Sequence, residues 1–287
     1  MVIGADGLLG WSIAQRLRIC GRQVITTSRK TRNSSDSCIY LDLSEDISSW
    51  RVPGDIDMVF FCAAITSTEK CRSNPEESRI VNVDNTVALA SMLVQKSVSV
   101  IFPSTNLIFD GRSPYKKSDS RVCPRVEYGR QKAAVEERLM NLGGNSSIVR
   151  FTKILGPENE LVNQWIKQLR TKTVIHPLSD IVLSPISVDF ASQIMLKIAD
   201  SGNDGIWQVS GKEDITYEQL GRHIARKLGV SQRYVQPTKV SDSGLRFEYV
   251  PRHTTLDMSR AESELGFACP DVWDTIDSLF ETKYGQG

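Results

Sequence analysis

The sequence predicts an α/β protein with a Rossmann-like, doubly wound parallel sheet. Three observations lead to this prediction. Short apolar runs alternate with amphipathic stretches through the first half of the chain, a glycine-rich turn follows the first apolar run, and residues 58–61 are apolar without interruption. Strands that alternate with helices pair in parallel, and a parallel strand is buried on both faces, which requires such an unbroken run.

The same patterns give the order of the elements. We predict strands at residues 2–3, 24–25, 39–41, 58–61, 98–102, 147–151 and 206–209, and helices at 11–19, 81–93, 128–142 and 189–198. Only three residues precede Gly4. The first strand is therefore predicted to be very short, and an upstream native start stays open.

The rhythm of strands and helices loosens after residue 155. Segments 156–185 and 211–287 carry more turns and shorter elements, whereas 186–210 again contain a helix and a strand. We predict a dinucleotide-binding domain over 1–155, with 186–210 returning to its sheet. Segments 156–185 and 211–287 are predicted to form a smaller, mixed α/β substrate-binding domain at the C-terminal edge of the sheet.

Composition limits the class of protein. The 287 residues have a net charge of +1, which favours neither nucleic acid nor an anionic membrane as a partner. We find no apolar run long enough to span a bilayer and no signal peptide, and the six cysteines lack paired spacing. A cytoplasmic protein with free thiols is expected. The three histidines are scattered, so no metal site is expected.

The glycine-rich turn predicts a dinucleotide cofactor. Gly4 permits a tight turn, Gly7 lets the backbone approach a pyrophosphate, and Gly10 lets the helix pack on the sheet. The N-terminus of the following helix presents free N–H groups and a positive dipole to the phosphates. Cofactor contacts are expected along the whole turn, at Gly4, Asp6, Gly7, Leu8, Leu9 and Gly10.

The second strand leads into Ser28-Arg29-Lys30, where an NAD-specific enzyme usually carries an acid. An arginine beside a hydroxyl suits a 2′-phosphate, so NADP(H) is preferred and NAD(H) stays open. The alternative is a solvated basic loop. Asp42 and Leu43 follow the third strand, where the adenine ring is expected, and the small Ala63 and Ala64 follow the fourth. These two alanines either leave room for the dinucleotide or simply pack closely.

A second group of residues predicts proton transfer. Tyr128 and Lys132 are four residues apart, so they share one face of a helix. An ammonium beside a phenol stabilises the phenolate and lowers its pKa, which makes Tyr128 a candidate general acid. Ser104 and Thr105 follow the strand 98–102 and should emerge at the same sheet edge, where a hydroxyl can donate to a substrate carbonyl.

These residues resemble the extended short-chain dehydrogenase/reductase family, and more narrowly its dTDP-4-dehydrorhamnose reductase group. The group's Ser-Thr-Asp-Tyr-Val-Phe-Asp-Gly stretch is similar to residues 104–111, and its Tyr-Gly-x-x-Lys to residues 128–132. Its Asn-Ala-Ala and Val-Asn-x-x-Gly-Thr motifs resemble residues 62–64 and 81–86, and its Arg-Pro-x-x-Ser-x-Leu-Asp motif resembles residues 252–257. The resemblance therefore runs nearly end to end.

The resemblance implies a reductase that passes hydride from NADPH to C4 of a nucleotide-linked 4-keto-6-deoxy sugar. Thr105 would polarise the carbonyl, Tyr128 would protonate the alkoxide, and Lys132 would tune Tyr128 and bind the ribose. It also implies Asn82 as a cofactor contact, a nucleotide sugar as substrate and a homodimer as an open question. The implied substrate residues are Thr66, Ser104, Asn106, Lys153 and Arg252.

Two departures from the group's pattern fall where the sugar is expected. Its Asp-Tyr after the threonine is replaced by Asn106-Leu107, and its Arg-Thr-Ser-Trp stretch by residues 150–153. An altered substrate is therefore expected. A sugar-nucleotide dehydratase is disfavoured because it needs Asp-Glu after the threonine. An epimerase stays open, as does a regulatory subunit similar to the β-subunit of methionine adenosyltransferase, which binds NADP and acts through a partner.

Overall fold

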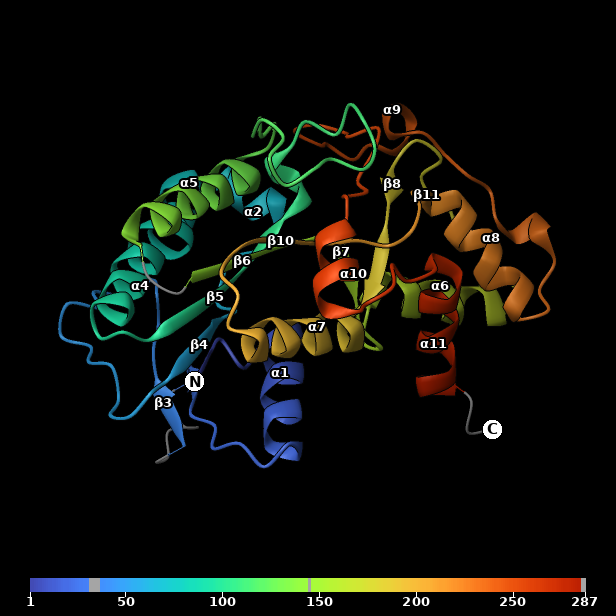
Figure 1. The fold of residues 1–287 in the computed structure, drawn as a ribbon. Coiled ribbons are helices and arrows are strands. Elements are labelled where there is room, and N and C mark those ends of the chain that lie inside the picture. Colours follow the sequence, from blue (N-terminus) through green and yellow to red (C-terminus); the bar gives the residue numbers. More distant parts are fainter. Residues whose placement is uncertain (31–36, 144–145, 285–287) are drawn as a thin grey trace.

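The computed structural model describes residues 1–30, 37–143 and 146–284. It shows a central sheet with helices on both faces and a smaller helical unit beside one edge (Figure 1). The strands are β1 (Val2–Ile3), β2 (Thr26–Ser28), β3 (Cys38–Tyr40), β4 (Met58–Phe61), β5 (Ser99–Thr105), β6 (Ser146–Phe151), β7 (Lys153–Leu155), β8 (Val182–Leu183), β9 (Pro185–Ser187), β10 (Gly205–Val209) and β11 (Ile215–Thr216).

The helices alternate with these strands through the first half of the chain. The helical elements along the chain are α1 (Leu8–Ile19), α2 (Thr68–Ser73), α3 (Pro75–Arg79), the π-helix η2 (Ile80–Asp84), α4 (Asn85–Gln95), the 3₁₀ turn η3 (Asn106–Ile108), α5 (Glu127–Leu142), α6 (Glu160–Arg170), α7 (Val188–Ser201), α8 (Tyr217–Lys227), the 3₁₀ turn η4 (Gln232–Tyr234), α9 (Val240–Ser243), α10 (Ser259–Leu265) and α11 (Val272–Tyr284).

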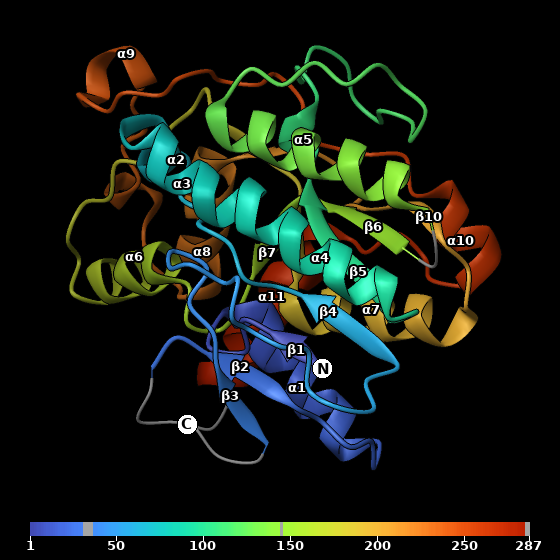
Figure 2. The same ribbon diagram turned by 90° about the vertical axis from the view of Figure 1, so that its left-hand side faces the viewer.

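The main sheet has the order β10-β6-β5-β4-β1-β2-β3, and every neighbouring pair is parallel. The strand order reverses at β1, between β2 and β4, which is where dinucleotides bind in doubly wound folds. Helices α4 and α5 cover one face, and α1 and α7 cover the other (Figures 1 and 2). The predicted Rossmann-like fold is confirmed.

The central strands are apolar on both sides because each side faces a different core. Val59 and Phe61 join a cluster that includes Leu89 of α4 and Leu139 of α5. Phe60 joins a second cluster with residues of α1 and α7. An unbroken apolar run is the pattern that such a doubly buried strand requires.

Helices α6, α8 and α11, which follow Leu155 in the chain, pack together in the smaller unit. Its own core includes Trp165 and Leu169 from α6, Leu220 and Ile224 from α8, and Ile276 from α11. These helices lie together beside the sheet (Figure 1). Strand β10 is part of the main sheet, where Gly205 pairs with Ser147 of β6.

Some element boundaries differ from the prediction. β2 lies at Thr26–Ser28, directly after the predicted strand at 24–25, and β5 continues to Thr105 because its pairing with β6 extends to Thr105 and Phe151. The hydroxyls of Ser104 and Thr105 are therefore part of the strand end itself. The predicted helix 81–93 begins as the π-helix η2, in which the N–H of Asn85 donates to the carbonyl of Ile80.

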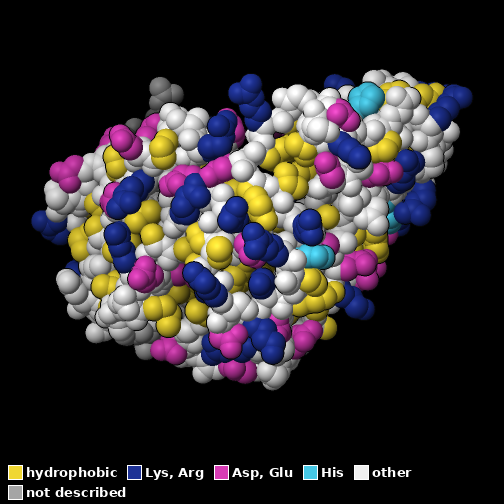
Figure 3. Space-filling view, turned by 90° about the horizontal axis from the view of Figure 1, so that it is seen from above, with side chains coloured by type: hydrophobic (Ala, Val, Ile, Leu, Met, Phe, Trp, Pro, Cys, Tyr) yellow, Lys and Arg dark blue, Asp and Glu magenta, His cyan; other side chains and the backbone are white. Residues whose placement is uncertain are grey.

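Within the described residues, we find no helix both long and apolar enough to cross a bilayer. On the face viewed from above, Lys and Arg side chains are interspersed with Asp, Glu and hydrophobic ones (Figure 3). This face therefore shows no extended surface of one charge that would attract a polyanion.

Candidate active site

The glycine-rich turn is packed so tightly that two of its positions need glycine. Gly4 has a φ of +84°, and a Cβ there would lie 2.6 Å from the backbone nitrogen of Ala63. A Cβ on Gly10 would overlap the carbonyl oxygen of Gly4. Gly7 is the N-cap of α1, and as a glycine it has no side chain with which to cap this helix end. The free N–H groups of the first turn therefore suit an anionic ligand.

The end of β2 lies next to this turn. Gly4 donates its N–H to Thr27 Oγ1 at 3.1 Å, and the buried Ser28 hydroxyl is bonded to Asp6. Arg29 and Lys30 are exposed, and so is Asp6. Two cations and one carboxylate are thus presented where the adenosine ribose is expected.

The other predicted cofactor positions line the same sheet edge. The Asp42 carboxylate accepts hydrogen bonds from the N–H and the hydroxyl of Ser44, while Leu43 is buried. Gly4 packs against Ala63, which agrees with close packing at this position, while room for the dinucleotide stays a prediction. Ala64 follows it and is partly buried.

Asn82 braces two segments of the protein, and its expected contact with the cofactor stays a prediction. Its side chain is 2% exposed, accepts from the N–H of Ile65 at 2.7 Å, and donates to the Ile65 carbonyl at 2.9 Å and to Gln131 Oε1 at 2.8 Å. Both amide protons are therefore used within the protein, and Oδ1 accepts one internal hydrogen bond with one of its two lone pairs. It ties the segment before Thr66 to α5.

The candidate catalytic residues meet at the end of β5. Gly129 makes this possible, because a Cβ there would overlap the carbonyl oxygen of Leu107 in η3. The absence of a side chain lets α5 press its first turn, with Tyr128, against the residues that follow Thr105. Thr105 Oγ1 accepts the N–H of Leu107 at 3.2 Å and lies 3.4 Å from Asn106 Oδ1.

Lys132 lies one helical turn after Tyr128 and is buried with it. Its ammonium donates to the carbonyl of Pro103 at 2.7 Å, lies 4.1 Å from the centroid of the Phe102 ring and 5.9 Å from that of Tyr128. Burial lowers the pKa of Lys132 to about 8. Burial raises the pKa of Tyr128, so the expected lowering by Lys132 is not seen. Desolvation of the phenolate outweighs an ammonium at this distance.

Ser104 belongs to a network that sequence reasoning missed. Its hydroxyl donates to Glu136 Oε1, and Glu136 pairs with Arg150, whose Nη1 donates to the carbonyl of Ser118 at 2.8 Å. A serine has one proton to donate, so Ser104 would have to break this bond in order to donate to a substrate, and its role there stays a prediction. A signal existed in the sequence, since Glu136 lies four residues after Lys132 on the same helical face.

The remaining predicted substrate residues come from separate parts of the chain, and they differ in how far they are exposed to solvent. Thr66 and Arg252 are exposed, and Asn106 is partly buried beside Thr105. Lys153 begins β7, two residues after the strand position that pairs with Thr105. Its side chain is accessible to solvent, and yet the surrounding protein lowers its pKa by desolvation.

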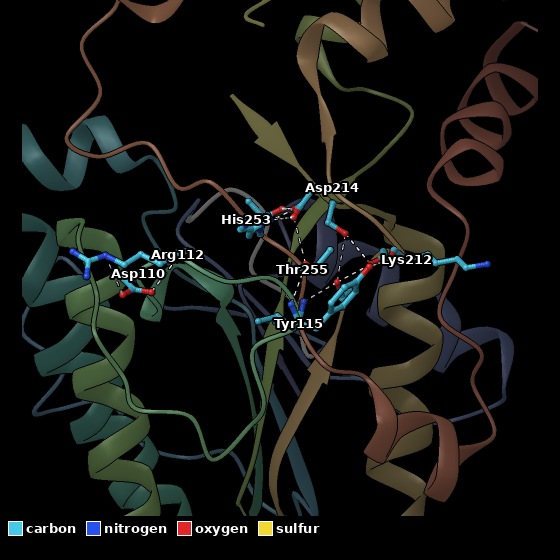
Figure 4. A network of polar contacts seen from close by, with 12 residues as sticks. Asp110, Arg112, Tyr115, Lys212, Asp214, His253 and Thr255 are labelled. Carbon is cyan, nitrogen blue, oxygen red and sulfur yellow. Dashed lines mark hydrogen bonds and ion pairs between the residues drawn. The ribbon is translucent and has the colours of Figure 1, made fainter. Parts of the chain in front are cut away.

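The loop after η3 is held by residues from the C-terminal unit (Figure 4). Tyr115 donates its N–H to Thr255 Oγ1 at 3.2 Å and its hydroxyl to the carbonyl of Lys212 at 3.2 Å. Asp214 accepts from both the N–H and the hydroxyl of Thr254, at 2.8 and 2.6 Å, and from His253. The backbone next to Arg252 is thus fixed against the loop that follows the catalytic strand.

A second connection reaches the N-terminus of α5. The carboxylate of Glu248 accepts the N–H of Glu127 at 2.9 Å and pairs with Arg130. A cavity of about 620 Å³ adjoins this contact and is lined by Arg72 and by residues of segment 240–248. No group of three or more His, Cys, Asp or Glu side chains in the described ranges is arranged to hold a metal ion.

The family model described as the RmlD substrate-binding domain matches residues 1–284. The chain belongs to the RmlD family. Among curated relatives of this RmlD-family chain, a probable low-salt glycan biosynthesis reductase of Haloferax volcanii is 27% identical over 97% of the chain and 96% of the relative.

Two further proteins are informative. The methionine adenosyltransferase 2 subunit beta of Xenopus laevis is 22% identical over 91% of the RmlD-family chain and 81% of the relative. The crystal structure of dTDP-4-dehydrorhamnose reductase from Bacillus anthracis, a complex with NADP, matches with a TM-score of 0.83, 18% identity and 98% coverage of both chains. At this identity the structural match shows a shared fold.

Proposed function

We propose that this RmlD-family chain is a cytoplasmic reductase that uses NADPH to reduce the 4-keto group of a nucleotide-linked 6-deoxy sugar. The observation that carries the proposal is the joint burial of Tyr128 and Lys132 at the end of β5, beside Thr105. Family membership and the reductase among the curated relatives support it. The six free cysteines fit a reducing compartment.

The cofactor fits the residues at the turn between β1 and α1. The helix end without a side-chain cap suits the pyrophosphate, and the exposed Arg29 and Lys30 suit a 2′-phosphate. Asp42 and Leu43 would border the adenine, and Lys132 would bind the nicotinamide ribose. When bound, the reduced nicotinamide supplies the hydride.

Tyr128 supplies the proton for the reduced oxygen. Reduction needs a neutral phenol, and burial keeps Tyr128 protonated by raising its pKa. Thr105 ends β5, the strand whose Pro103 carbonyl accepts from Lys132, and it orients the substrate carbonyl by donating its hydroxyl proton. The smaller domain, predicted over 156–185 and 211–287, would bind the rest of the substrate together with Thr66, Asn106, Lys153 and Arg252.

A regulatory role is the second candidate, because a curated relative is named as a subunit of methionine adenosyltransferase. Such a protein can keep Thr105, Tyr128 and Lys132 without turning over a sugar. A dehydratase is disfavoured because Asn106 and Leu107 stand where its two acids are needed. An epimerase would also use Tyr128, but it would hold its cofactor tightly through many turnovers.

The test is oxidation of NADPH in the presence of a panel of nucleotide-linked 4-keto-6-deoxy sugars. Tyr128→Phe is compared with Tyr234→Phe, which removes a hydroxyl from η4 in the smaller unit. Turnover that collapses in Tyr128→Phe alone, by about 100-fold or more, supports the reductase. Cofactor binding without turnover on any sugar, together with copurification of a stoichiometric partner, would favour the regulatory role.

A further inference from the structure

The Ser28 hydroxyl connects the end of β2 to the glycine-rich turn. Ser28 Oγ donates to Asp6 Oδ2 at 2.7 Å and accepts the N–H of Lys30 at 3.1 Å. A serine hydroxyl has one proton to donate. Because this proton goes to Asp6, Ser28 has no donor left for a ligand that offers only acceptors.

Asp6 reaches this position because the turn and the strand end run side by side. Strands β1 and β2 are parallel neighbours, with Val2 paired to Thr26. Beyond this pair, Gly4 N donates to Thr27 Oγ1 at 3.1 Å and Ala5 N to the Thr27 carbonyl at 3.3 Å. The Asp6 carboxylate therefore lies at the end of β2, where many NAD-binding proteins carry an acid on the strand itself.

We infer that Asp6 sets the cofactor selectivity of this chain by favouring a free ribose 2′-hydroxyl over a 2′-phosphate. This inference rests on the cofactor site of the proposed function. A ribose hydroxyl can donate to the free lone pairs of the Asp6 carboxylate. A 2′-phosphate has only acceptors and negative charge, and it would meet the carboxylate at close range.

Arg29 and Lys30 act in the opposite direction. Both are exposed at the same strand end and attract a 2′-phosphate. The wild-type chain should therefore bind NADPH and NADH with dissociation constants within about tenfold of each other, because the two influences oppose one another. The cations alone would give a strong preference for NADPH, and Asp6 reduces that preference.

The experiment measures the dissociation constants of NADPH and NADH by fluorescence titration, without any sugar substrate. Asp6→Asn keeps an oxygen that can accept from Ser28, removes the charge and puts an amide donor in place of the second oxygen. We expect the affinity ratio to move toward NADPH by about tenfold or more. Asp274→Asn removes the same charge from an exposed position on α11 and should leave the ratio unchanged. Arg29→Ala should move the ratio toward NADH.

A ratio in Asp6→Asn that stays within about twofold of the wild-type ratio would overturn the inference. So would a shift toward NADH. A shifted ratio in a chain that reduces no sugar would support the role of Asp6 while counting against the proposed reductase. Failure of the wild type to bind either cofactor would overturn both.

Discussion

Glu136 and Arg150 form an ion pair that is almost completely shielded from water. Arg150 Nη2 lies 2.7 Å from Glu136 Oε2, and the two side chains are 2% and 6% exposed. The guanidinium also lies 5.3 Å from the centroid of the Phe109 ring. The pair joins α5, which carries Tyr128 and Lys132, to β6 and, through Ser104, to the end of β5.

Loss of one partner of this pair should be costly. Glu136→Ala leaves the Arg150 charge buried without its counterion, so we expect a loss of about 3–5 kcal/mol in the free energy of unfolding. Glu69→Ala removes a partner of the exposed Arg72 and should cost less than about 1 kcal/mol. Chemical denaturation of both variants measures these losses. Similar losses of unfolding free energy in Glu136→Ala and Glu69→Ala would contradict the burial of the pair formed by Glu136 and Arg150.

Thr105 and Ser104 should respond differently to loss of their hydroxyls. Thr105→Val keeps the shape and removes the donor proposed for the substrate carbonyl, so the turnover number should fall by about 100-fold with little change in stability. Ser104→Ala removes a bond to Glu136 and should mainly lower stability, by about 1–2 kcal/mol. Steady-state kinetics and thermal unfolding on both variants separate these effects. Equal losses of turnover in the two would place both hydroxyls at the substrate.

Gly129 should not tolerate a methyl group, although alanine favours helices. Gly129→Ala gains about 1 kcal/mol in helix propensity, but its Cβ overlaps the carbonyl of Leu107 and should cost about 1–3 kcal/mol. Because α5 must move away, turnover should fall with stability. Gly54→Ala is the control, since a Cβ there meets no atom of the described residues within 4 Å. A fully active, stable Gly129→Ala would show that α5 has room to shift.

The features that could be predicted from the sequence are those that depend on near neighbours in the chain. The glycine turn, the strand β4 and the shared face of Tyr128 and Lys132 follow from local spacing. Asn82 could not be assigned in this way, because its partner Gln131 is 49 residues away and only the folded chain shows that its side chain is occupied. The bond between Ser104 and Glu136 and the pKa of Tyr128 likewise depend on burial that tertiary packing creates.

The buried charge of Lys132 should lower the free energy of unfolding, although the residue is needed at the proposed site. Burial lowers its pKa from 10.5 to about 8, which corresponds to a cost of about 3 kcal/mol while the folded chain holds the charge. Its bond to the Pro103 carbonyl is part of the folded state and is lost on substitution. Lys132→Met should therefore raise the free energy of unfolding at pH 7 by about 1–2 kcal/mol, while turnover falls sharply.

The direction in which stability changes with pH gives a separate test of the lowered pKa of Lys132. Below about pH 8 Lys132 is charged in both the folded and the unfolded chain, so its full cost is present. Between about pH 8 and 10.5 the unfolded chain binds more protons than the folded chain, so the stability of the wild type rises relative to the variant. The stability advantage of Lys132→Met should thus shrink as the pH rises from 7 to 10 in paired unfolding measurements. An advantage that stays constant over this range would show that Lys132 does not titrate there.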